Sequence, residues 1–258
     1  MPIDSAVAAA AFVETFEFFE SVFQGGWTHA KGGGLAAVSG VAFPTLNGVW
    51  VERLEADPQD IADLLDEVAA TGLPHCLQFR PGGADRMATL AASRGMARDE
   101  DIPLMVAEDP AQLSAAQAVS GLTIRELSPD EAHLHARLAA IGFEAPLEMF
   151  LQLMTPSVLA APGVRCYVGE ADGQPVTTGL GVSLGPYVAI FNIATPPGQR
   201  RRGYGAAVTA RAVADGLAAG AKWSWLQASP AGYKVYERLG FRTVETWQCW
   251  LAATPSRS

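Results

Sequence analysis

The chain contains few cysteines and no long hydrophobic run. Its three cysteines, Cys76, Cys166 and Cys249, are odd in number, far apart and set in apolar surroundings. We therefore expect buried free thiols in place of a disulfide or a metal site. No apolar run approaches the roughly 18 residues of a membrane span, and the alanine-rich start contains Asp4 but lacks the basic residues of a secretory signal. These absences predict a cytoplasmic protein with no membrane partner and no bound metal.

Charge is divided unevenly between the two halves of the 258-residue chain. Residues 1–115 have 6 Lys+Arg and 17 Asp+Glu, a net charge of −11, whereas residues 116–258 have 12 and 10, a net charge of +2. With 49% hydrophobic residues, this indicates two globular domains, 1–115 and 116–258. The acidic half argues against a nucleic-acid partner. Its field would gently favour cationic amine substrates, although solubility alone also explains the charge.

A strand, a basic turn and a helix follow one another at residues 190–220. An apolar run ends at two prolines, which cannot donate to a sheet ladder, so a strand is predicted to end near Thr195. Three arginines at 200–202 and a Gly-Tyr-Gly segment at 203–205 come next. Apolar residues then repeat at helical spacing over 206–217. The strand therefore leads through a glycine-containing turn into a helix.

This turn has the chemistry of a phosphate site. The first N–H groups of a helix have no internal partner and lie at the positive end of its dipole, so an anion there gains hydrogen bonds and a favourable field. Glycine lets the anion approach the backbone, and arginine adds charge-assisted contacts. A solvated face or a nucleic-acid patch would also explain the three arginines, but their place between a strand and Gly203 favours phosphate.

Two familiar phosphate loops are missing. A Walker loop would end in Gly-Lys-Ser or Gly-Lys-Thr, and a dinucleotide fingerprint would need a third glycine where Val208 stands. The segment Arg200-Arg201-Arg202-Gly203-Tyr204-Gly205 instead resembles the R/Q-x-x-G-x-G/A signature of the GNAT superfamily of N-acetyltransferases. Residues 229–241, which end in a Gly-Phe pair, resemble the next strand-helix turn of the same family. The resemblance covers roughly residues 122–252.

The resemblance implies a fold of the α/β (α+β) class with two GNAT-like domains, each a mixed, mostly antiparallel sheet flanked by helices. The first half repeats the order of elements of the second, starting from Leu77-Gln78 and Leu226-Gln227. It has no R-x-x-G-x-G segment, and residues 55–60 are acidic where a pyrophosphate would lie. We interpret it as a degenerate copy that serves as a packing partner or substrate wall; chance similarity of α/β order is the alternative.

The resemblance also implies a site for acetyl-CoA, and an amine as the acceptor. The expected cosubstrate-binding residues are Ile193, Ala194, Thr195, Arg200, Arg201, Arg202, Gly203, Tyr204, Gly205, Ala206, Ser229 and Tyr233. A backbone N–H near Ile193 or Ala194 would stabilise the oxyanion. Ser229 departs from the asparagine that many relatives carry. Tyr236 matches the family's general acid, with Tyr233 one turn earlier as the fallback.

The general base is less clearly indicated. An amine with a pKa of about 10 is mostly protonated at neutral pH, so attack on a thioester benefits from a base. Residues 191–193 are neutral where some relatives carry a carboxylate, which leaves Glu144 or a water relay. His133 and His135 are spaced by two, unlike the i, i+4 pair of a zinc site, and are expected at the surface.

The predicted function is an N-acetyltransferase that moves an acetyl group from acetyl-CoA to the amine of a small molecule or peptide. The amine would attack directly, with Tyr236 as general acid and Glu144 as the candidate that orients or deprotonates it. A non-catalytic CoA-binding sensor or interaction protein is the alternative. We expect a monomer or a homodimer.

Overall fold

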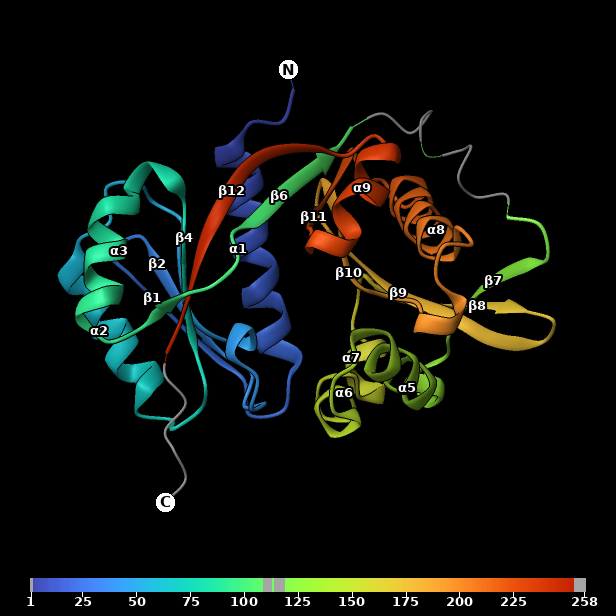
Figure 1. The fold of residues 1–258 in the computed structure, drawn as a ribbon, viewed down its shortest axis with the longest axis horizontal. Coiled ribbons are helices and arrows are strands. Elements are labelled where there is room, and N and C mark those ends of the chain that lie inside the picture. The colour runs from blue at the N-terminus through green and yellow to red at the C-terminus, as the bar shows by residue number, and fades with distance from the viewer. Residues whose placement is uncertain (1, 109–112, 114–118, 253–258) are drawn as a thin grey trace. The chain divides into compact units, whose positions relative to one another are not determined.

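The computed structural model describes residues 2–108, 113 and 119–252 (Figure 1). The chain divides into two compact units. The N-terminal unit contains residues 4–104 together with the described residues from 243 onward, and the C-terminal unit contains residues 105–242 with the N-terminal tip up to Ile3. The predicted domain boundary between residues 115 and 116 lies outside the described residues.

Within its described residues, the N-terminal unit is built from three α-helices and a mixed sheet. Its helices are α1 (Ser5–Val22), α2 (Pro58–Ala69) and α3 (Ala84–Ser93), with short 3-10 turns at Pro44–Leu46 and Pro81–Gly83. Its strands are β1 (Trp27–Lys31), β2 (Gly34–Val38), β3 (Asn47–Val51), β4 (Cys76–Phe79), β5 (Ala97–Arg98) and β12 (Arg242–Leu251). The strand order is β1-β2-β3-β4-β12, with β5 paired to β12. Only the β3–β4 pair is parallel among the pairs described in this unit.

Apolar side chains fill both faces of this sheet. Helices α2 and α3 supply Ile61, Leu64 and Met87, among others, to one buried cluster with the strands. Helix α1 begins at Asp4, whose carboxylate accepts hydrogen bonds from the first free N–H groups of the helix, as an N-cap residue does. Its Phe12 ring meets Trp247 of β12 edge-on at 5.0 Å. A helix and the last strand of the chain are therefore packed together.

Strand β12 comes from the end of the chain but belongs to the sheet of the N-terminal unit. It runs antiparallel to β4, with Gln248 opposite Phe79 and Leu251 opposite Cys76. Strand β6 (Ile102–Ala107) is divided, because its first three residues belong to one unit and its last three to the other. The unit is therefore not a continuous piece of the sequence.

The C-terminal unit has the same order of elements on a larger scale. Its helices are α5 (Ala132–Phe143), α6 (Leu147–Leu153), α7 (Pro156–Leu159), α8 (Tyr204–Ala218) and α9 (Pro230–Arg238), with 3-10 turns at Pro129–Glu131 and Pro197–Gln199. Its strands include β7 (Leu122–Glu126), β8 (Val164–Ala171), β9 (Gln174–Leu184), β10 (Tyr187–Ala194) and β11 (Trp223–Gln227), ordered β11-β10-β9-β8-β7. Neighbours are antiparallel except β10 and β11. The predicted fold class is confirmed.

Two clusters of buried side chains cover this second sheet. Helix α8 contributes Val208 and Val213 to one cluster, which also contains Leu239 directly after α9. Helices α5 and α6 contribute Ala136, Phe150 and their neighbours to another, which includes Ala194 at the end of β10. Figure 1 shows α8 and α9 on one side of the strands and α5 to α7 on the other. The end of β10 is thus enclosed by helices from both sides.

Two expectations about individual side chains are tested by the structure. All three cysteines are buried free thiols, as predicted. His133 is exposed, but the prediction that His135 lies at the surface is wrong, because this side chain is fully buried. No helix within the described ranges is long and apolar enough to cross a membrane.

Candidate active site

The sheet of the C-terminal unit opens between β10 and β11. In the part of the chain that the structure describes, the parallel ladder joins Tyr187, Val188 and Ala189 to β11 and then stops, while β10 continues to Ala194. Backbone groups on a strand need partners wherever they are shielded from water. An opening between two parallel strands therefore offers hydrogen-bonding groups to an extended ligand that enters between them.

A β-bulge lies in the part of β10 beyond the ladder. Its register against β9 shifts between Phe191 and Ala194, and Asn192 adopts a left-handed φ of 52°. The Asn192 side-chain amide donates to the Met154 sulfur at 3.7 Å. A bulge bends a strand and redirects its side chains, and bulges are common next to active sites. It was not predicted from the sequence, although asparagine in an apolar strand is one of the few side chains that favour this backbone conformation.

The turn after β10 is held in place by hydrogen bonds. Thr177 Oγ1 donates to the Ala194 carbonyl at 3.0 Å and shares a hydrogen bond with Thr195 Oγ1 at 2.9 Å. Helix α5 also approaches closely, since a Cβ on Gly142 would come within 2.8 Å of the Ala194 Cβ. Ala194 is buried and Thr195 is half-buried. These contacts therefore fix the position of the turn that follows β10.

Helix α8 begins with unpaired backbone donors. Its N-cap is Gly203, which has no side chain to accept a hydrogen bond, and the first N–H in the helix with a backbone partner is that of Ala207, which donates to the Gly203 carbonyl. The N–H groups of Tyr204, Gly205 and Ala206 have no protein partner among the described residues. Three free donors at the positive end of a 15-residue helix are groups from which an anion could accept hydrogen bonds.

Glycine is favoured at positions 203 and 205 of this turn for different physical reasons. Gly203 has a φ of 83°, a left-handed conformation that other residues seldom adopt. Gly205 has ordinary helical backbone, and an added Cβ would make only van der Waals contacts of 3.5 Å with Ile193 and Thr195. Neither the fold nor the packing requires glycine at 205. Its missing side chain instead leaves space directly beside the free N–H groups, as a bound phosphate would need.

The three arginines of the turn are not equivalent. Arg200 donates to the carbonyl oxygens of Gly142 at 2.7 Å and Thr195 at 3.2 Å, and forms an ion pair with Glu144 at 3.2 Å. Arg201 and Arg202 are exposed and have no ion pair among the described residues. Arg200 therefore fastens the turn to the end of α5, and the other two are available to an anionic ligand.

Glu144 is placed beside the turn by this ion pair. It ends α5 in a left-handed conformation with a φ of 54°, and its side chain is 67% exposed. Its carboxylate can attract a cation, and its charge is partly balanced by Arg200. The structure thus brings Glu144 and Arg200 together, a pairing that their spacing in the sequence gave no reason to expect.

Helix α9 carries the remaining predicted residues. Ser229 is its N-cap, and its hydroxyl oxygen accepts a hydrogen bond from the Gly232 N–H at 3.2 Å. Tyr233 and Tyr236 are half-buried and pack against the cluster of α8 side chains. Tyr236 meets Phe241 edge-on at 6.0 Å, and burial raises the pKa of its phenol to about 12. The phenol is therefore protonated at neutral pH and can donate a hydrogen bond.

His135 is a buried polar residue whose environment the sequence did not reveal. Its Nδ1 lies 2.7 Å from Thr178 Oγ1, which itself donates to the Tyr167 carbonyl at 2.7 Å. Nδ1 is therefore the donor, and Nε2 has no partner among the described residues. Burial lowers the pKa of His135 to about 4, so the ring is neutral near pH 7. The hydrogen bond between His135 and Thr178 therefore links α5 to β9.

Comparisons with known proteins agree with this geometry. Residues 130–241 match the family model described as the acetyltransferase (GNAT) family. No curated protein matches the chain in sequence. A solved GCN5-related N-acetyltransferase from Kribbella flavida is 18% identical, with a TM-score of 0.72 over 95% of this chain and 95% of that chain. An N-acetyltransferase-like protein from Streptococcus suis is 14% identical, with a TM-score of 0.59 over 95% and 98% of the two chains.

A structure with two GNAT halves is also similar. A tandem GNAT protein from the clavulanic acid biosynthesis pathway is 15% identical, with a TM-score of 0.57 over 90% of this chain and 83% of that chain. At these identities the likeness concerns the fold, whereas the family match concerns the sequence of the C-terminal unit. Residues 130–241 therefore match the acetyltransferase (GNAT) family in sequence, and the chain as a whole has the fold of solved GNAT structures, one of them a tandem GNAT protein.

Proposed function

We propose that the protein is an N-acetyltransferase that moves an acetyl group from acetyl-CoA to the amine of a small molecule or peptide. The observation that carries the proposal is the row of free N–H groups in the first turn of α8, placed where β10 separates from β11. The family match supports acetyl-CoA as the ligand of this site, because acetyl-CoA carries a pyrophosphate and an extended amide-containing arm.

The residues around the opening fit such a cosubstrate. The N–H groups of Tyr204, Gly205 and Ala206, with Gly203 at the helix start, would hold the pyrophosphate, and Arg201 and Arg202 would add charge from the exposed side of the turn. Backbone groups of residues 193–195 would pair with the arm. Ser229 and Tyr233 at the start of α9 would line it, with the Ser229 hydroxyl hydrogen still available to donate.

The transfer step requires an oxyanion donor, a proton donor and a way to neutralise the amine. Acetyl-CoA supplies an acetyl group activated as a thioester. A backbone N–H of Ile193 or Ala194 donates to the carbonyl oxygen as negative charge develops there. Tyr236 donates its phenolic hydrogen to the departing sulfur. With a pKa of about 12 it is a weak acid, so its main effect is a hydrogen bond that strengthens as the sulfur gains charge.

Glu144 is assigned to the acceptor amine. Its carboxylate attracts an ammonium group, and Arg200 holds the carboxylate beside the turn. A water molecule can carry the proton from the amine to bulk solvent or to this carboxylate, since a primary amine with a pKa of about 10 must lose a proton before attack.

The alternative function is a CoA-binding sensor or interaction protein without turnover. The absence of a carboxylate on residues 191–193 favours it weakly. The test is turnover of a panel of primary amines with acetyl-CoA, followed by release of the free thiol, in the wild type and in Tyr236→Phe. We expect turnover to fall by about 100-fold in the variant, with the dissociation constant for acetyl-CoA unchanged. Unchanged turnover would remove Tyr236 from the mechanism, and binding with no turnover of any amine would favour the sensor.

A further inference from the structure

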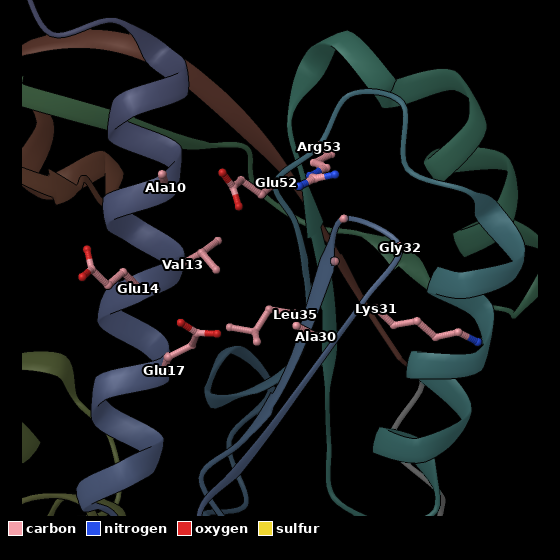
Figure 2. A pocket seen from close by; sticks show the side chains of 12 residues that line it. Ala10, Val13, Glu14, Glu17, Ala30, Lys31, Gly32, Leu35, Glu52 and Arg53 are labelled. Carbon is pink, nitrogen blue, oxygen red and sulfur yellow. The ribbon is translucent and has the colours of Figure 1, made fainter.

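The N-terminal unit has a cleft of its own, distinct from the site above. It has a volume of about 440 Å³ and lies between α1, the β1–β2 hairpin and the end of β3 (Figure 2). All of its lining residues belong to the N-terminal unit. A concave space of this size is typical of small-molecule sites. Acetyl-CoA binding gives no reason for a cleft here, because the acidic turn after β3 lacks the free helix donors of α8.

The cleft combines an apolar surface with two carboxylates on opposite walls. Val13 of α1 and Leu35 of β2 supply the apolar surface, and Glu17 and Glu52 supply the carboxylates. The third glutamate of the lining, Glu14, is directed away from the β1–β2 hairpin (Figure 2). Figure 2 shows Glu17 and Glu52 extending from α1 and from the end of β3 into the space between these elements. Neither carboxylate has a hydrogen bond or an ion pair among the described residues. Two acceptors thus face the cleft without a cation to balance them.

The basic residues of the lining do not provide that balance. Lys31 pairs with Asp60 at 3.2 Å and with Asp63, both on α2, and Figure 2 shows its side chain directed toward that helix. Arg53 is exposed and lies over Gly33, where an added Cβ would approach the Arg53 side chain to 2.6 Å. The first 115 residues have a net charge of −11, so the surrounding field also favours a cation.

We propose that this cleft binds a small organic cation, namely an amine with a compact apolar body. The ammonium group would lie between Glu17 and Glu52, and the apolar body would cover Val13 and Leu35. An organic anion of the same size would bring a further negative charge beside these carboxylates, so we expect it not to bind. The proposal does not depend on acetyl-CoA binding or on turnover.

The test is a titration of the full-length protein, without acetyl-CoA, with 2-phenylethylamine and with the anion 3-phenylpropionate of similar size. Binding is followed by calorimetry and by the amide resonances of Gly32, Gly33 and Gly34 at the rim. We expect the amine alone to bind and to shift these resonances. Glu17→Gln and Glu52→Gln should each weaken binding by about tenfold, as the loss of a charge-assisted hydrogen bond does.

Glu55→Gln is the matched control, since it removes the same charge from an exposed residue outside the lining. It should change affinity by less than about twofold. Equal weakening by Glu55→Gln would assign the effect to the general field and overturn the site. Binding of 3-phenylpropionate as tight as that of the amine, or the absence of amine binding with the fold intact, would also overturn it. Ala10→Trp, at an exposed position of the lining, should block the amine without removing a charge.

Discussion

Each half of the molecule contains two parallel strands joined by a helix, β3–α2–β4 in one and β10–α8–β11 in the other. We call the place where the first of these strands leads through a turn into the helix the crossing, and the two crossings differ. In the N-terminal unit the parallel ladder joins β3 to all four residues of β4, and the following helix starts at Asp57, whose carboxylate accepts the Gln59 N–H. In the C-terminal unit the ladder ends after Ala189, and the following helix starts at Gly203 with free donors. One crossing is closed and satisfied by its own side chains, and the other is open to a ligand.

An arginine reinforces the closed state of the N-terminal unit. Arg80, directly after β4, donates to the Glu52 carbonyl directly after β3 at 3.3 Å, so it links the ends of the two parallel strands. It also forms a two-pronged ion pair with Glu245 of β12 and bonds the Ser5 hydroxyl. Both charged side chains are 10% exposed. Sheet topology alone therefore does not make a site, because the cap residue and the length of the ladder decide whether a ligand can enter.

The largest effect should come from giving α8 the cap that α2 has. Gly203→Asp would place a carboxylate on the free N–H groups and repel the pyrophosphate. We expect the dissociation constant for acetyl-CoA to rise from about 1 µM to beyond about 1 mM, a loss of at least about 4 kcal/mol. Titration calorimetry with acetyl-CoA measures this dissociation constant. Gly203→Ala is the control, since it has the same backbone strain without the charge and should keep most of the affinity.

Loss of the arginine link should affect stability and leave cosubstrate binding unchanged. Arg80→Met leaves the Glu245 carboxylate buried without its partner, which should cost the N-terminal unit about 3–5 kcal/mol of unfolding free energy. Denaturant unfolding measures the loss, and Arg80→Met combined with Glu245→Leu should recover much of it. A large change in acetyl-CoA affinity in Arg80→Met would show that the two crossings are not independent.

The units should respond to pH in opposite directions. Burial raises the pKa of Glu20 in α1 to about 8, so the folded N-terminal unit keeps a proton that the unfolded chain releases, and its stability falls as pH rises from about 4.5 to 8. Burial lowers the pKa of His135 to about 4, so the C-terminal unit loses stability as pH falls from about 6.5 to 4. The change in unfolding free energy is on the order of 5 kcal/mol for Glu20 and on the order of 3 kcal/mol for His135.

Hydrogen exchange resolved by unit tests these pH trends, with exchange rates corrected for the intrinsic effect of pH. Amides of β2 and β3 report one unit and those of β8 and β9 the other. Glu20→Gln should flatten the first pH dependence and His135→Asn the second. Parallel pH profiles in both units, or slopes unaffected by these substitutions, would disprove the assignments.

The smallest effect should come from the exposed arginines. Arg201→Ala and Arg202→Ala should each weaken acetyl-CoA binding by about threefold to fivefold, because an exposed ion pair contributes about 1 kcal/mol or less and is screened by salt. The losses should shrink as the salt concentration rises. A loss of about 100-fold from either variant would mean that side chains hold the pyrophosphate more strongly than the helix donors do.

The crossing in the C-terminal unit could be predicted because its signals are local. The prolines that end β10, the glycines of the turn and the apolar spacing of α8 lie within one stretch of sequence, and each acts on its own backbone. The acidic turn after β3 was predicted for the same reason. The early end of the β10–β11 ladder was not, since it depends on a bulge and on packing by α5.

Features that depend on distant partners could not be predicted. The two halves have the same order of strands, so nothing local to β12 indicates that it pairs with β4. The spacing of His133 and His135 places them on different faces of a helix but does not say which face is buried. The contacts of Arg200 depend on Gly142 and Glu144, which are distant in sequence, and Glu144 adopts an unusual backbone conformation.

The most direct measurement is a calorimetric titration of acetyl-CoA into the wild type and into Gly205→Val, with thermal unfolding as the control for folding. If only the crossing at α8 is open, the wild type should bind one molecule per chain at about micromolar concentration, and the variant should bind none while it melts near the wild-type temperature. Two molecules per chain, no binding to the wild type, or unchanged binding in a folded Gly205→Val would contradict the contrast between the open and closed crossings.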